Sequence, residues 1–139
     1  MRHPLHPAFA HFPVACWSLA VAADFASLWL GEAAWRWSGG LLAVGCAVAV
    51  LAMLAGMVEL PRVPDGAPMR DAWTHMSAML AAFTFFAARL LLGLDHLRPV
   101  APDQVSLLLD AGGFIALLVG GWFAGRLVYG HGVGRDRPE

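Results

Sequence analysis

Four long apolar stretches alternate with short polar segments along the chain. The apolar stretches cover about residues 7–30, 40–60, 71–94 and 105–129. A helix needs roughly 20 residues to cross a hydrocarbon core about 30 Å thick, and each stretch is at least that long. The pattern therefore predicts an all-α integral membrane four-helix bundle, in which residues 1–139 form a single transmembrane domain.

The connecting segments contain residues that interrupt helices. Residues 31–39 are predicted to form a short polar turn that contains two tryptophans. Residues 61–68 are rich in Pro and Gly and cannot continue a helix. Residues 95–104 carry Pro99 and Pro102, so we expect a third turn there.

Composition supports the membrane interpretation. Hydrophobic residues make up 59% of the chain and charged residues 14%, whereas soluble domains average about 45–50% and about 25%. The formal net charge is −1 and no basic block is present, so lipid is an expected partner and nucleic acid is not. The sequence has no nucleophile elbow, phosphate loop or HExxH motif, and it leaves open whether the protein is an enzyme.

Arginine placement predicts the orientation. Four spans put both termini and the 61–68 segment on one face, and that face collects most of the arginines outside the spans. Arg36 and Arg98 lie on the other face. Because cytoplasmic loops are enriched in basic residues, we expect both termini to be cytoplasmic in a bacterial inner membrane. The arginines on the cytoplasmic face would be Arg2, Arg62, Arg70, Arg126, Arg135 and Arg137.

Histidines concentrate at the same end of the predicted bundle. His11 lies near the start of the first span and His75 near the start of the third, which runs parallel to it. His6 precedes the first span, and Glu59 and His131 end the second and fourth. Polar groups are costly in a membrane and so indicate function. We therefore expect these side chains to form one layer.

A second polar level is predicted deeper along the same helices. Asp24 follows His11 and Arg89 follows His75 by about the same distance along parallel helices. Because either charge alone would be costly in the membrane, Asp24 and Arg89 should form an ion pair. Asp110 is placed to join this level from the fourth span.

Small residues form a stripe on the fourth span. In lipid, such stripes let helices approach each other closely. The stripe has two interpretations, packing inside the bundle or a homodimer interface. It consists of Gly112, Ala116, Gly120 and Ala124, with Gly121 and Gly125 beside them.

Several short motifs, in order along nearly the whole chain, resemble a bacterial membrane family named domain of unknown function 2231. The resemblance implies a polytopic membrane protein, and because some members are fused to Rieske-type iron–sulfur domains it hints at electron transfer. The two cysteines of this chain are too few for such a centre. The motifs are His3-Pro4-Leu5-His6-Pro7, His11-Phe12-Pro13, Ala55-Gly56 with Glu59, His75, Gly120-Gly121, Leu127-Val128-Tyr129 and His131-Gly132-Val133-Gly134.

The first functional hypothesis is a small b-type cytochrome. Haem iron accepts imidazole ligands, and His11 and His75 come from separate helices at similar depth. Arg62 or Arg70 would then meet the haem propionates. Such a protein would transfer one electron at a time, to a quinone or an iron–sulfur redox partner.

Two alternatives stay open. A non-haem site for zinc, copper or iron would use His6, His11, His75, His131 and Glu59. Alternatively, the bundle is a structural or assembly subunit that uses its fourth helix as a contact surface.

Overall fold

Four long helices make up most of residues 5–134, the part of the chain that the computed structural model describes. Short elements connect or follow these helices, among them a two-stranded β-hairpin and a π-helical turn at the end. The elements are α1 (Leu5–Leu30), α2 (Glu32–Glu59), η1 (Leu60–Arg62), α3 (Ala67–Leu92), β1 (Leu94–Asp95), β2 (Arg98–Pro99), α4 (Gln104–Gly125) and η2 (Arg126–Gly130).

Each of the four long helices is long and apolar enough to cross a membrane. The candidate spans have 25 to 31 residues, which at about 1.5 Å per residue exceeds the thickness of the hydrocarbon core. Large apolar side chains such as Leu19, Leu54 and Ile115 are exposed on their outer faces, where lipid would cover them. The predicted all-α membrane four-helix bundle is confirmed.

Helix α2 begins at Glu32 rather than near residue 40, so the expected polar turn is shorter than the sequence suggested. Gly31, with a φ of 69°, makes the reversal alone. Glu32 and Arg36 form an ion pair of 2.7 Å within the first helical turns, which supports helix where a loop was expected. Gly39 stays helical and lies against the β-hairpin, where an added Cβ would be 3.0 Å from Pro99 Cγ.

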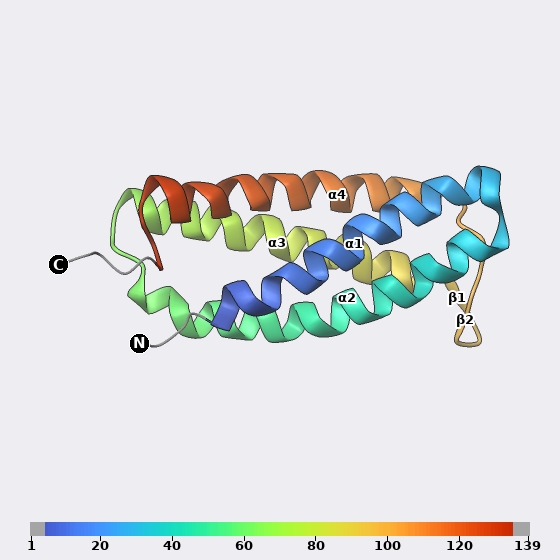
Figure 1. The fold of residues 1–139 in the computed structure, drawn as a ribbon, viewed down its shortest axis with the longest axis horizontal. Coiled ribbons are helices and arrows are strands. Elements are labelled where there is room, and N and C mark those ends of the chain that lie inside the picture. The colour runs from blue at the N-terminus through green and yellow to red at the C-terminus, as the bar shows by residue number, and fades with distance from the viewer. Residues whose placement is uncertain (1–4, 135–139) are drawn as a thin grey trace.

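The bundle consists of two helical hairpins, α1–α2 and α3–α4, and most contacts between helices lie within each hairpin. Figure 1 shows the two hairpins side by side, with the start of α1 and the end of α4 at the same end of the bundle. We call this end the termini end, and we call the opposite end, which holds Gly31 and the β-hairpin, the loop end. Few contacts join the two hairpins to each other.

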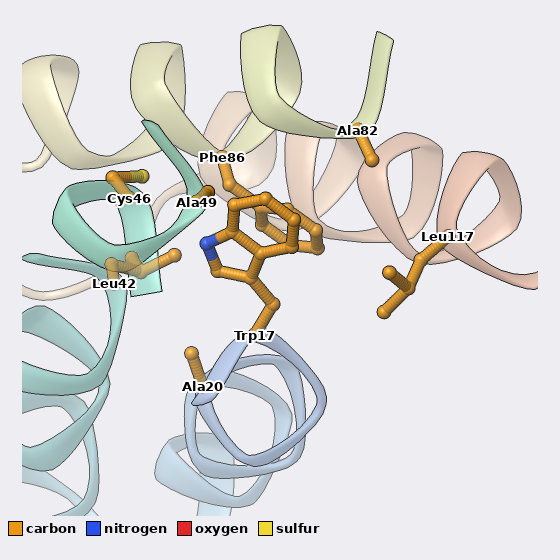
Figure 2. Close-up of a cluster of buried hydrophobic side chains, with 8 residues drawn as sticks. All are labelled: Trp17, Ala20, Leu42, Cys46, Ala49, Ala82, Phe86 and Leu117. Carbon is orange, nitrogen blue, oxygen red and sulfur yellow. The ribbon is translucent and has the colours of Figure 1, made fainter. Parts of the chain in front are cut away.

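An aromatic pair lies where the hairpins meet. Trp17 of α1 stacks on Phe86 of α3 with ring centroids 4.9 Å apart and planes 23° apart (Figure 2). Gly45 of α2 makes room for the indole, because a Cβ there would lie 2.8 Å from Trp17 Cδ1. The surrounding buried side chains are Ala20, Leu42, Cys46, Ala49, Ala82 and Leu117.

The turn expected over residues 95–104 contains a short β-hairpin. Leu94 pairs with Pro99 and Asp95 with Arg98. The two residues of its turn, His96 and Leu97, have φ values of 47° and 63°. Both are left-handed, as the two-residue turns that match strand twist require, although Gly and Asn are the usual residues there.

Candidate functional site

Two histidines from different hairpins meet near the termini end. The rings of His6 on α1 and His75 on α3 have centroids 6.0 Å apart and planes 81° apart. Both side chains are half-buried. The two imidazoles therefore face each other across the sparse interface between the hairpins.

Hydrogen bonds to backbone carbonyls orient both rings. His6 Nδ1 lies 2.7 Å from the carbonyl oxygen of Ala52, and His75 Nδ1 lies 2.8 Å from that of Gly120. A carbonyl oxygen only accepts, so each Nδ1 carries the proton and donates. In a neutral ring with this tautomer, Nε2 keeps its lone pair, which is the usual state of a histidine that binds a metal through Nε2.

Two glycines, which lack a side chain, make room for the His6 ring and for Met79 beside the histidine pair. A Cβ on Gly56 of α2 would lie 3.1 Å from His6 Nδ1. A Cβ on Gly120 of α4 would lie 2.6 Å from Met79 Sδ, on the helix that carries His75. The histidine pair is thus closely surrounded, and larger residues at either glycine would force its neighbours to move.

The expected pairing of His11 with His75 is replaced by the contact between His6 and His75. His11 is exposed, and its Nδ1 hydrogen-bonds the carbonyl oxygen of Pro7 within α1. Since α1 begins at Leu5, His6 and His11 share one continuous helix. Five residues apart, they point about 140° away from each other around the helix axis. Only one of them can face α3, and it is His6.

Glu59 holds the first turn of α1 against the end of α2. The backbone N–H of His6 donates to Glu59 Oε1 over 3.2 Å. A carboxylate near a helix N-terminus is favourable, because the unpaired N–H groups there carry partial positive charge. Glu59, expected among the metal ligands, therefore positions the His6 backbone.

A second polar cluster near the termini end contains a residue that sequence reasoning missed. Asp71 of α3, 7% exposed, has its Oδ2 2.8 Å from His131 Nε2 and 3.1 Å from Arg126 Nε. His131, expected as a metal ligand, is thus held by a carboxylate. The available signal was that Asp71 lies one helical turn before His75, on the same face of α3.

The two arginines expected to meet haem propionates lie in the connection at the termini end. Arg62 is in η1 and Arg70 is in the first turns of α3. Both are exposed, so their guanidinium groups are available to an anionic group at the membrane surface.

Near the loop end, Asp24 and Arg89 form a buried ion pair. Arg89 Nη2 and Nε lie 2.7 and 2.9 Å from Asp24 Oδ2. Asp110 joins them, with its Oδ2 3.7 Å from Arg89 Nε. Asp24 and Asp110 are 0% exposed and Arg89 is 3% exposed, so this is a fully buried triad.

The small-residue stripe of α4 divides between two faces. Gly112 packs against α3 inside the bundle, as Gly120 does, because a Cβ there would be 3.0 Å from Phe85 Cε1. Gly121 and Gly125 have no atom of the described residues near the position of an added Cβ. Gly112 and Gly120 therefore serve packing within the chain, and a homodimer interface would have to use the outer glycines.

The histidine pair brings two imidazoles together. Among residues 5–134, no group of three or more His, Cys, Asp or Glu side chains is placed to hold a metal ion. Two imidazoles could hold haem iron, or a transition-metal ion together with other groups.

Comparison with known proteins identifies the family of the chain. No curated protein and no solved structure matches the chain. A family model described as "Predicted membrane protein (DUF2231)" matches residues 2–137. The chain therefore belongs to this family of membrane proteins of unknown function.

Proposed function

We propose that the protein is a small b-type cytochrome-like membrane protein, which holds haem b between His6 and His75 and transfers one electron at a time. The observation that carries the proposal is the meeting of these two imidazoles from α1 and α3, with each Nδ1 bonded to a carbonyl. His6 here takes the role that the sequence suggested for His11.

The separation of the rings is compatible with binding of one metal ion by both imidazoles. A metal–nitrogen bond is about 2.0–2.1 Å, so two nitrogens that bind one ion would be at most about 4 Å apart. The ring centroids lie farther from the ion than these nitrogens do. Centroids 6.0 Å apart are therefore close to the spacing that shared ligation needs.

The room for a porphyrin would come from the interface between the hairpins. Contacts between hairpins are few compared with contacts inside them, so a separation of the hairpins at the termini end would preserve most of the packing. Haem bound there would have Arg62 and Arg70 at the neighbouring surface for its propionates. When bound, haem supplies a one-electron Fe(III)/Fe(II) couple.

A bare transition-metal ion is the second candidate, favoured by the close surroundings of the histidine pair. A Cβ at Gly56 would already approach the His6 ring to 3.1 Å, so a single ion needs less rearrangement than a macrocycle. Imidazole nitrogen suits copper, zinc and iron. With copper or iron, the site would still carry one electron.

The expected setting is the bacterial inner membrane, with a quinone or an iron–sulfur protein as the redox partner. Arg62, Arg70 and Arg126 lie at the termini end, whereas Arg36 and Arg98 lie at the loop end. The excess of basic residues supports a cytoplasmic termini end. A partner would then exchange electrons with the histidine site from that side.

The test is an absorption spectrum of protein purified in mild detergent, oxidised and reduced. We expect a Soret band and sharp reduced bands in the wild type, lost in both His6→Ala and His75→Ala. His11→Ala is the matched control, because His11 is exposed on the same helix, and it should keep the spectrum.

Three results would overturn the haem assignment. Full haem retention by His6→Ala and His75→Ala would show that other residues bind it. A colourless protein with one copper, zinc or iron per chain, lost in the same two variants, would select the bare ion. No haem and no metal would refute both candidates and leave a structural or assembly role.

A further inference from the structure

A layer of buried polar side chains crosses the bundle near the loop end, far from the histidine pair. Each long helix contributes one residue to it, and each of these residues is at most 3% exposed. The four are Asp24 on α1, Ser38 on α2, Arg89 on α3 and Asp110 on α4.

The packing of the helices puts these residues at one level. Trp17 of α1 packs against Gly45 of α2. Two helical turns further toward the loop end, the antiparallel course of α1 and α2 brings Asp24 and Ser38 to matching positions. Arg89 reaches Asp24 directly, and Asp110 lies beside Arg89, so the layer is continuous.

The layer has one positive charge for two carboxyl groups. Arg89 donates both of its bonds to Asp24 Oδ2, and its Nε is 3.7 Å from Asp110 Oδ2, beyond hydrogen-bond distance. Among the described residues, Asp24 Oδ1 and both oxygens of Asp110 have no hydrogen-bond partner, nor does Ser38 Oγ. Burying an uncompensated charge and unpaired oxygens is costly, so something is missing from this arrangement.

A proton would supply what is missing. The carboxyl groups of Asp24 and Asp110 both approach the same nitrogen, Arg89 Nε, at 2.9 and 3.7 Å. Ionised carboxylates only accept hydrogen bonds, so two of them beside one guanidinium group repel each other unless one carries a proton. We propose that Asp24 and Asp110 together bind one exchangeable proton, shared between them as an O–H···O hydrogen bond.

Binding of the proton changes the charge of the layer from −1 to zero. Arg89 neutralises the carboxyl group that stays ionised, and the proton neutralises the other. Ser38 Oγ, which has no hydrogen-bond partner among the described residues, is the polar group of α2 at this level. Asp103, exposed at the start of α4, is a further charged group that interacts electrostatically with Arg89.

The layer lies directly beneath the β-hairpin, so water at the loop end is the nearest source of the proton. Gly93, just before β1, leaves room for the guanidinium, because a Cβ there would lie 1.9 Å from Arg89 Nη1. Pro99 of β2 packs on Gly39, the neighbour of Ser38. The β-hairpin thus covers the layer on both α2 and α3.

Proton release on unfolding tests the site. The protein is unfolded with sodium dodecyl sulfate at pH 7 in weak buffer, and the pH change is recorded. An unfolded Asp has a pKa of about 3.9 and cannot keep a proton at this pH. We expect the wild type to release about one proton more per chain than Asp110→Asn, whose amide replaces the protonated carboxyl group.

Infrared spectroscopy of the folded protein gives a second readout that does not depend on unfolding. The wild type should show the carbonyl stretch of a protonated carboxylic acid at neutral pH, and Asp110→Asn should lose it. Asp95→Asn, a change at the exposed β-hairpin, is the matched control and should keep the band.

Equal proton release by wild type and Asp110→Asn, together with no carboxylic acid band, would overturn the proposal. A wild type that lacks the band but is stabilised by sodium chloride and not by choline chloride would also overturn it, because the missing charge would then be a metal cation. If Asp110→Asn fails to fold, the band in the wild type and its loss in Asp24→Asn decide the question.

Discussion

Replacing Arg89 by Met should destabilise the bundle more than replacing Asp24 by Asn. Arg89 bonds Asp24 at 2.7 and 2.9 Å and lies 3.7 Å from Asp110, and all three side chains are buried. Arg89→Met leaves two carboxyl groups without a positive charge. Asp24→Asn leaves Arg89 beside Asp110, which can take over as its counter-charge. A simple two-residue ion pair would show no such asymmetry.

The magnitudes follow from the burial. Removing one partner of a buried ion pair costs about 3–5 kcal/mol, which is our expectation for Arg89→Met. A hydrogen bond to a charged group contributes about 1.5–3 kcal/mol, and Asn keeps an oxygen that accepts from Arg89. We therefore expect Asp24→Asn to cost about 1–2 kcal/mol, near the lower limit of that range.

The assay is reversible unfolding in mixed micelles of dodecyl maltoside and sodium dodecyl sulfate, followed by circular dichroism. Arg36→Met is the control, because its ion pair with Glu32 is 67% and 61% exposed. Loss of such a surface pair should change the unfolding free energy by less than about 1 kcal/mol. Equal losses for Arg89→Met and Asp24→Asn would refute the role of Asp110 in the triad.

Two further predictions concern the core and the start of α4. Trp17→Ala removes the indole that stacks on Phe86 and should lower the unfolding free energy by about 3–5 kcal/mol in the same micelle assay. Asp103 accepts the backbone N–H of Ser106 over 2.8 Å, and this bond lowers the pKa of the Asp103 carboxyl group. Because the bond favours the ionised form, its stabilisation should be lost as pH falls through that lowered pKa. Hydrogen exchange of the Ser106 amide, corrected for intrinsic rates, should then accelerate in the wild type and not in Asp103→Asn.

The sequence predicted the level of a residue along the bundle axis better than the side of the helix on which its side chain lies. The number and length of apolar stretches are sufficient for four spans, because a hydrocarbon core admits few alternatives. Counting residues along parallel helices also placed Asp24 and Arg89 at one level, where the structure pairs them. These inferences need only the helical rise, which hardly varies.

Counting residues along a helix does not show which side of the helix a residue faces. His11 and His75 have similar depth, but His6 faces α3 because α1 is already helical at Leu5. Whether His6 and His11 share one regular helix depends on where α1 begins. Pro7 is compatible with a helix that begins either before it or at it, so the sequence did not fix this point. The partnership of Asp71 with His131 was missed for a related reason, since it depends on how η2 turns after α4.

The sparse interface between the two helical hairpins has a consequence for biosynthesis. Gly31 reverses the chain within a single residue, so α1 and α2 can leave the translocation machinery as one preassembled unit. The α3–α4 unit can follow independently. Joining of the units, with Trp17 closing on Phe86, would then be the last step, after all four segments are already in lipid.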